Sequence, residues 1–296
     1  MTVPGPAERE ALERRIAAHL GALDEVRAAR DRDPSLPRVT VITPSFNQGR
    51  FIERTIRSVL NQGWGNLEYF VVDGASTDGT AETIGKYAPY LSWWVSEPDR
   101  GQTEALGKGL VRATGKYVTW VCSDDVLMPG ALEAMVGALE SRPDAGIVYG
   151  KVVFLDGEDR VVKVLSFPDV TRHMLLYHKH STLAQPSSLM RRDILAEAGG
   201  LDESLHYCMD YDLWIRLLGR GAAVNLGEAV LSGYRLHAGS KTVGSYRKMA
   251  LEKIRVNRRY TGDVVNRVIF RHYRYIVEDA VRTLKRSLGI GKNAPR

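Results

Sequence analysis

The chain has 296 residues, of which 44% are hydrophobic and 26% are charged. This composition is typical of one large globular domain with extensions, and it excludes a disordered or collagen-like chain. No apolar run is long enough to span a bilayer, the charged N-terminus lacks a signal-peptide core, and only two cysteines occur, so we expect a reduced cytoplasmic protein.

The net charge of +6 is concentrated at the C-terminal end. Residues 251–296 contain twelve Lys and Arg against four Asp and Glu, a net charge of +8 that leaves about −2 for the rest. A segment of this kind attracts phosphates, anionic lipid or nucleic acid, or it is simply a solvated helix face.

The first predicted element is a helix over residues 6–30, which has apolar side chains at helical spacing and is ended by Pro34 and Pro37. Short apolar strands then alternate with helices. Strands are predicted at 39–42, 67–72, 91–95 and 117–122, and helices at 51–60, 80–87, 102–113 and 130–141. Strands and helices that alternate at this length predict right-handed βαβ units and a mostly parallel sheet.

The second half of the chain follows a different pattern. A hairpin is predicted around Asp156-Gly157, followed by a helix at 210–218 and short strands near Ala223 and Val230. Residues 245–288 are predicted to be helical, with an apolar stripe surrounded by arginines.

Polar residues follow each of the first four predicted strands. These clusters are Thr43–Asn47, Asp73–Ser76, Glu97–Arg100 and Ser123–Asp125. The ligands of parallel sheets bind beyond the carboxyl ends of the strands. We therefore expect the four clusters to form one shared site.

Ser123-Asp124-Asp125 places two adjacent carboxylates at the end of a strand. Their mutual repulsion has to be offset, and a hard divalent cation completed by diphosphate oxygens is one common solution. A helix cap is the alternative interpretation. The glycines that follow Asp73 do not form the Gly-x-Gly-x-x-Gly dinucleotide fingerprint, and no P-loop is present.

Asp210 and Asp212 open a predicted helix but cannot share one of its faces. One of them can face a cleft as a general base while the other caps or pairs, and both can equally be helix-start aspartates favoured by the helix dipole. His237 is either a structural histidine or a ligand for phosphate or metal.

Several stretches taken together resemble glycosyltransferase family 2, the inverting family with the GT-A fold, from Val39 to about Thr242. The matching stretches are Val41–Asn47, Ser58–Gln62, Val72–Thr80, Glu97–Gly101, Ser123–Asp125 and Asp210–Trp214. Their order and spacing are more specific than any one of them alone.

The resemblance implies a role for each matched residue. It places the donor nucleotide sugar beside Thr43, Pro44, Ser45, Asn47, Asp73, Asp99, Gly101, Gln102 and Asp124. It implies that Asp125 and His237 bind Mn²⁺ or Mg²⁺ and that Asp210 is the catalytic base. The chain departs from the family pattern at Met209, where Glu is frequent, and at Gly107, where Asn is usual.

The resemblance implies an α/β protein with a GT-A fold that is Rossmann-like, with a mostly parallel sheet. Its function would be to transfer a sugar from a nucleoside diphosphate sugar, a UDP-sugar in the first instance, to an acceptor hydroxyl of a glycan, glycolipid or small molecule. A sugar nucleotidyltransferase and a non-catalytic sugar-nucleotide-binding protein are the alternatives. A nucleotidyltransferase needs a glycine-rich basic loop after the first strand, which Thr43–Asn47 is not.

The expected organisation is a helical extension at 1–37, a catalytic domain at 38–243 and a basic helical extension at 244–296. Within the catalytic domain, 38–127 would bind the donor and 128–243 the acceptor. The basic extension is expected to touch the anionic inner face of the membrane, or else a partner subunit or the catalytic domain. No nucleic-acid partner is expected.

Overall fold

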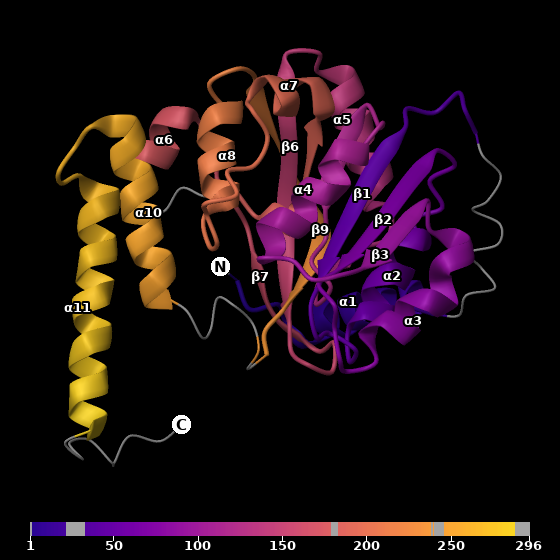
Figure 1. The fold of residues 1–296 in the computed structure, drawn as a ribbon, viewed down its shortest axis with the longest axis horizontal. Coiled ribbons are helices and arrows are strands. Elements are labelled where there is room, and N and C mark those ends of the chain that lie inside the picture. Colours follow the sequence, from indigo (N-terminus) through magenta and orange to yellow (C-terminus); the bar gives the residue numbers. More distant parts are fainter. Residues whose placement is uncertain (1, 22–32, 179–182, 238, 240–245, 288–296) are drawn as a thin grey trace.

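A computed structural model describes residues 2–21, 33–178, 183–237, 239 and 246–287 (Figure 1). A single mixed sheet runs through the molecule in the order β3-β2-β1-β4-β8-β6-β9-β5, with β7 paired to β6. The strands are β1 Val39–Ser45, β2 Leu67–Asp73, β3 Trp93–Ser96, β4 Tyr117–Trp120, β5 Val126–Leu127, β6 Ala145–Leu155, β7 Val161–Leu165, β8 Ser188–Arg191 and β9 Ala222–Arg235.

The first four strands are parallel, as the alternation of strands and helices predicts. Their register aligns Ser45 of β1 with Asp73 of β2, and Asp73 with Ser96 of β3. Three polar residues therefore end neighbouring strands at the same edge of the sheet. This edge carries the polar loops that follow the strands.

The second half of the sheet is mixed. β8 pairs antiparallel with β4 and β6, whereas β6 and β9 are parallel to each other. The prediction of two short strands near Ala223 and Val230 is wrong, because β9 is one strand of 14 residues. The pairing of β9 with β6 shifts register near Tyr149 and Lys151, and Gly227 in β9 has a φ of 56°. This irregularity interrupts the strand pattern in the sequence, which is why one long strand was predicted as two short strands.

Helices cover both faces of the sheet (Figure 1). They are α1 Pro6–His19, α2 Ile52–Leu60, α3 Thr80–Tyr87, α4 Gln102–Arg112, α5 Ala131–Ser141, α6 Arg172–Tyr177, α7 Arg192–Glu197, α8 Met209–Leu217, α10 Tyr246–Thr261 and α11 Arg267–Ser287, with 3₁₀ turns at Ala88–Tyr90 and Gln185–Ser187. The predicted helix at 6–30 ends at His19 in the described part of the chain, and residues 22–32 lie outside it.

Two hydrophobic layers lie on opposite faces of the sheet. Val41 of β1 packs with α2, α3 and α5, whereas Ile42, the next residue, packs with α4 and α8. This alternation follows from the two-residue period of a strand. In the second layer Trp120 of β4 stacks on Trp214 of α8, with ring centroids 6.1 Å apart, and this contact joins the sheet to α8.

The segment predicted to be helical at 245–288 contains two helices, α10 and α11. Gly262, with a φ of 71°, follows α10, and α11 then runs back beside α10 (Figure 1). Asn257 of α10 donates hydrogen bonds to the Leu176 carbonyl at 2.8 Å and to the Tyr211 hydroxyl at 3.0 Å, so α10 packs on α6 and α8. Among the helices that the structure describes, none has the length and apolar character needed to cross a membrane.

Candidate active site

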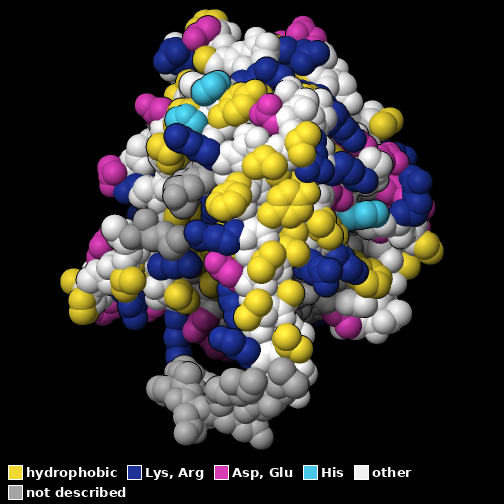
Figure 2. Space-filling model, turned by 90° about the vertical axis from the view of Figure 1, so that its left-hand side faces the viewer, with side chains coloured by type: hydrophobic (Ala, Val, Ile, Leu, Met, Phe, Trp, Pro, Cys, Tyr) yellow, Lys and Arg dark blue, Asp and Glu magenta, His cyan; other side chains and the backbone are white. Residues whose placement is uncertain are grey.

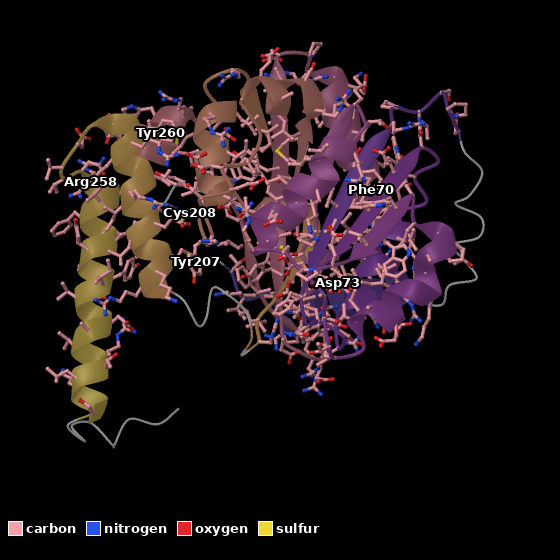
Figure 3. The ribbon with its side chains drawn as sticks, viewed as in Figure 1. Phe70, Asp73, Tyr207, Cys208, Arg258 and Tyr260 are labelled. Carbon is pink, nitrogen blue, oxygen red and sulfur yellow. The ribbon has the colours of Figure 1, made fainter. Side chains whose placement is uncertain are left out.

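Asp73 lies at the centre of the polar edge of the sheet (Figure 3). Its side chain is fully buried, and its carboxylate accepts hydrogen bonds from the Ser76 N–H at 2.9 Å, the Ser96 hydroxyl at 2.6 Å and the Ser76 hydroxyl. Charge-assisted hydrogen bonds of this kind keep a buried carboxylate in place. Asp73 is thus held rigidly where β2 ends.

The loop after β1 is joined to the loop after β2. Asn47 has a φ of 51°, and its side-chain oxygen accepts from the Thr77 N–H at 2.9 Å, while its own N–H donates to Ser76 Oγ at 2.7 Å. Gly49 N–H donates to Asp78 at 2.9 Å. These bonds make the two loops a single wall of the site.

Two other residues of the first cluster differ in their surroundings. Ser45 is 5% exposed, and within the described ranges its hydroxyl has no hydrogen-bond partner. A buried hydroxyl without a partner is unfavourable, so Ser45 can accept a ligand atom. The Thr43 hydroxyl instead lies 2.9 Å from the Tyr69 hydroxyl inside the sheet.

Asp99 connects the end of β3 to the start of α4. Its carboxylate accepts from the Gly101 N–H at 2.8 Å and packs against Gly74, where an added Cβ would lie 2.8 Å from Asp99 Oδ2. Gly74 therefore has to lack a side chain for this approach. Beyond Gly101, the Gln102 amide donates to Cys122 Sγ at 3.1 Å, so the start of α4 touches the segment after β4.

Cys122, Asp124 and Asp125 form the next part of the site. Their potential ligand atoms all lie within 4.8 Å of one another. Asp125 is 2% exposed, and burial, followed by repulsion from Asp124, raises the pKa of its carboxyl well above its usual range. The ionised form of both carboxylates is therefore unfavourable unless a positive charge lies close to the pair.

The end of β9 comes back to the same cluster. The Arg235 N–H donates to Asp125 Oδ1 at 3.1 Å, and its guanidinium donates to the Asp124 carbonyl at 2.7 Å and to Asp159 at 2.6 Å. His237 Nε2 lies 3.1 Å from Asp124 Oδ2. Of the two predicted metal ligands, Asp125 therefore belongs to the group whose ligand atoms lie within 4.8 Å of one another, and His237 lies next to that group through its contact with Asp124.

The donor set of this cluster fits a hard divalent cation. Two carboxylates and an imidazole are ligands that Mn²⁺ accepts, and the carboxylates also suit Mg²⁺. A cation here would offset the repulsion between Asp124 and Asp125. The Cys122 thiol is a softer ligand and adds little for either metal.

The two aspartates of α8 lie in different environments. Asp212 is buried and pairs with Arg216 at 2.6 Å and with the Tyr260 hydroxyl at 2.8 Å, so it joins α8 to α10. Asp210 accepts only the N–H of the next residue, Tyr211, at 2.7 Å among the bonds described. Burial raises the pKa of Asp210, which brings a carboxylate closer to the range of a general base.

The first turn of α4 also contacts the start of α8. The Thr103 hydroxyl donates to the Leu205 carbonyl at 2.7 Å and lies 2.8 Å from Met209 Sδ. The buried Met209 side chain therefore packs on α4 where the family often has Glu. A hollow of about 290 Å³ opens beside this contact, lined by Arg100, Gly101, Thr103, Glu104, Glu203 and His206.

Gly107 is the second departure from the family pattern. An added Cβ there would lie 3.3 Å from Glu203 Oε1, and Glu203 pairs with Arg100 at 2.7 Å. The Arg100–Glu203 ion pair therefore occupies the space that a side chain at position 107 would need.

Sequence reasoning missed several residues of the site. Cys122 could have been found, because it directly precedes Ser123-Asp124-Asp125. Arg235 carries no local pattern, and only the fold brings it from the end of β9 to the aspartate pair.

Comparisons with known proteins bear on the family and the fold of this chain. The family model described as "Glycosyl transferase family 2" matches residues 40–199. The chain is 30% identical over 213 residues to an uncharacterized glycosyltransferase of Rickettsia prowazekii, and the match covers 70% of this chain and 66% of the relative. A relative from Rickettsia conorii is 27% identical over 219 residues, and there the match covers 70% of this chain but spans only 36% of the relative.

Solved structures share the fold. S. aureus TarS in complex with UDP-GlcNAc has a TM-score of 0.61 at 18% identity and covers 74% of this chain and 65% of that chain. The mannosyltransferase PcManGT from Pyrobaculum calidifontis, in complex with GDP-Man and Mn²⁺, has a TM-score of 0.58 at 22% identity. The match covers 90% of this chain and 81% of that chain. At these identities the likeness shows the GT-A fold.

Proposed function

The chain belongs to glycosyl transferase family 2 and has the GT-A fold, and on this basis we propose that it is an inverting, metal-dependent enzyme that uses a UDP-sugar. The supporting observation is a continuous series of contacts. Asp73 lies beside Gly74 and Asp99, Gln102 reaches Cys122 next to the Asp124–Asp125 pair, and Thr103 reaches the start of α8. The residues expected to bind the donor, the metal and the acceptor are therefore neighbours through α4.

On the donor side, we assign the nucleotide to the wall formed by the loops after β1 and β2. Asp73 is a fixed acceptor for base or ribose donors, and the Ser45 hydroxyl is a buried group that still lacks a partner among the described residues. A UDP-GlcNAc-bound and a GDP-Man-bound protein share this fold, which supports a nucleoside diphosphate sugar.

We assign a divalent cation to Asp125, Asp124 and His237. When bound, Mn²⁺ or Mg²⁺ supplies positive charge against the diphosphate leaving group. The chain's own contribution is to fix this segment from the end of β9: the Arg235 main-chain N–H binds the Asp125 carboxylate, and the Arg235 guanidinium binds the Asp124 main-chain carbonyl.

Asp210 is the proposed base. Its carboxylate takes the proton of the acceptor hydroxyl as that oxygen forms a bond to the anomeric carbon. The bond from the anomeric carbon to the diphosphate oxygen breaks, and its electron pair leaves with the nucleoside diphosphate. A single displacement through an oxocarbenium-like transition state inverts the anomeric configuration.

The function can be tested without knowing the acceptor. UDP-sugars and GDP-sugars are screened with Mn²⁺ for binding by thermal shift and for slow hydrolysis by release of the nucleoside diphosphate. Asp125→Asn should lose metal-dependent binding of UDP, whereas Asp144→Asn, which removes an exposed ion pair with Arg142, is a matched control. Absence of binding and hydrolysis with every donor in wild type would contradict the proposal. Release of pyrophosphate from a sugar phosphate and UTP would instead identify a nucleotidyltransferase.

We further propose that α11 contacts an anionic membrane surface, so that the acceptor is lipid-linked or membrane-proximal. Phe270, Tyr273, Val277, Val281 and Leu284 are exposed at spacings of three and four residues, which places them along one side of the helix. Figure 2 shows hydrophobic side chains gathered over this face, with Lys and Arg around them.

The charges beside this apolar stripe favour lipid over a second copy of the chain. Arg267, Arg274, Arg282 and Lys285 are exposed on α11, against Glu278 and Asp279. Two such helices would bring like charges together, whereas anionic headgroups complement them. An apolar stripe with flanking cations is the pattern of an interfacial helix.

A further inference from the structure

The start of α8 is held by a carboxylate from another helix. Glu252 of α10 accepts hydrogen bonds from three consecutive main-chain N–H groups, those of His206 at 3.0 Å, Tyr207 at 2.6 Å and Cys208 at 2.7 Å. Its side chain is only 10% exposed. Tyr207 and Cys208 lie between α8 and α10 in Figure 3.

These three N–H groups need a partner from outside α8. His206 and Tyr207 precede α8 and Cys208 is its N-cap residue, so none of the three N–H groups bonds within the helix, and Cys208 makes no side-chain cap. Cysteine is a poor capping residue compared with Ser, Thr, Asp or Asn. The Glu252 carboxylate supplies the missing acceptor and also the negative charge that a helix N-terminus favours.

Asp210 is the second residue of α8, so its position depends on this cap. The segment that Glu252 binds ends two residues before Asp210, and on the other side Thr103 binds Leu205 and Met209. Thr103 of α4 and Glu252 of α10 therefore bind the turn at the start of α8 from two sides. Loss of the Glu252 contacts would release the main chain of residues 206–208, directly before the turn that carries Asp210.

Lys253, the next residue of α10, adds a cation to the same region. Its ammonium lies 4.2 Å from the centre of the Tyr211 ring. The charge of Lys253 lowers the pKa of Asp210 and of Cys208, against the larger effect of burial on both groups. Burial in turn lowers the pKa of Lys253 itself.

From these contacts we infer that α10 completes the acceptor side of the active site: Glu252 is a positioning residue for Asp210, and Lys253 places its side chain over the ring of Tyr211, the residue after Asp210. This inference rests on the proposed role of Asp210. It extends the catalytic unit beyond residue 243 and beyond the matched family region at 40–199. The C-terminal extension is then part of the enzyme's chemistry and not only a surface for attachment.

The test compares Glu252→Gln, Glu252→Asp and Asp210→Asn in the full chain. Turnover is measured as release of the nucleoside diphosphate from whichever UDP- or GDP-sugar the wild type hydrolyses fastest with Mn²⁺. Affinity for UDP with Mn²⁺ is measured by calorimetry, and amide hydrogen exchange at residues 206–208 reports on the cap directly. Glu278→Gln removes an exposed α11 carboxylate paired with Arg274 and is the matched control.

We expect Glu252→Gln to lower kcat at least tenfold and to speed amide exchange at 206–208, with KM and UDP affinity within twofold of wild type. Gln keeps one oxygen but places an NH₂ group where Glu252 accepts N–H donors, whereas Glu252→Asp keeps the carboxylate and should restore part of kcat. Glu278→Gln should behave as wild type.

Two results would overturn the inference while leaving the proposed function intact. One is a kcat within twofold of wild type in Glu252→Gln while Asp210→Asn is inactive. The other is an equal loss of UDP binding and kcat in Glu252→Gln, which indicates general disruption of the site. Full turnover in Asp210→Asn is a separate outcome, because it removes Asp210 as the base and the inference with it.

Discussion

Thr103 Oγ1 lies 2.8 Å from Met209 Sδ, and this contact joins the first turn of α4 to the first turn of α8. Gln102, one residue earlier, reaches Cys122 beside the aspartate pair. Two adjacent side chains of α4 thus connect the segment Cys122–Asp125 to the helix that carries Asp210.

Thr103→Val should weaken the contact between α4 and the start of α8. The substitution keeps the shape of the side chain but leaves the buried Leu205 carbonyl without its hydroxyl donor, so we expect a loss of about 1–3 kcal/mol in the free energy of unfolding. Turnover should fall severalfold while UDP affinity stays unchanged. Urea unfolding and calorimetry check these effects, and Thr83→Val on the exposed part of α3 is the control.

Asp210→Asn should remove transfer and preserve donor binding. The amide is nearly isosteric but cannot take a proton, so kcat should fall by roughly 10²–10⁴, the usual contribution of general base catalysis. Equal affinity of wild type and variant for UDP with Mn²⁺ checks that the site is intact. Asp212→Asn is expected to act differently, by weakening the ion pair with Arg216 and thus the stability of the protein.

Lys253→Met should shift the pH dependence of turnover. The ionisable groups that act on Asp210 are Lys253 and Glu252 from α10 and Cys208 from the segment before α8. Lys253 in turn is affected by Arg271 of α11. Removing the ammonium takes away a charge that lowers the pKa of Asp210, so the acid limb of the kcat profile should move to higher pH. An unchanged profile in an active variant would show that Lys253 does not act on Asp210.

Binding of α11 to anionic lipid should depend on both the stripe and the cations. We expect the full chain to sediment with vesicles of phosphatidylglycerol and phosphatidylcholine but not with phosphatidylcholine alone, and to be released by salt. Val277→Asp with Leu284→Asp should abolish sedimentation without changing UDP binding. Dimerisation of the wild type in solution that these substitutions break, without lipid binding, would instead identify a second copy as the partner.

Acid should destabilise the packing of α10 and α11 through His272. This histidine is 7% exposed, and burial together with Lys253 and Arg271 lowers its pKa from 6.5 to about 3. The folded protein therefore takes up this proton less readily than the unfolded chain, so stability is complete above pH 6.5 and falls as the pH drops toward 3.

At pH 5 the contribution of His272 should amount to a loss of about 2 kcal/mol relative to pH 7.5. Urea unfolding of wild type and His272→Gln at both pH values measures it. The variant should lose less stability on acidification than the wild type.

The sequence by itself determined the parallel half of the sheet and the edge at which its polar clusters lie. Short apolar strands alternating with amphipathic helices predicted the parallel sheet, and because parallel strands end at one edge, Asp73, Asp99 and Asp125 could be assigned to one site before any coordinates were known. Local periodicity and chain direction are enough for such a conclusion.

Only the tertiary structure decided how the site is completed. Arg235 meets Asp125 across 110 residues of chain, and Glu252 meets the start of α8 across more than 40. Neither contact has a period or spacing that a sequence could reveal, because each depends on how separate elements pack. The same holds for Asp210 and Asp212: either could face a cleft from the residue pattern alone, and the structure separates them, because Asp212 pairs with Arg216 and with Tyr260 of α10 whereas Asp210 accepts the N–H of Tyr211.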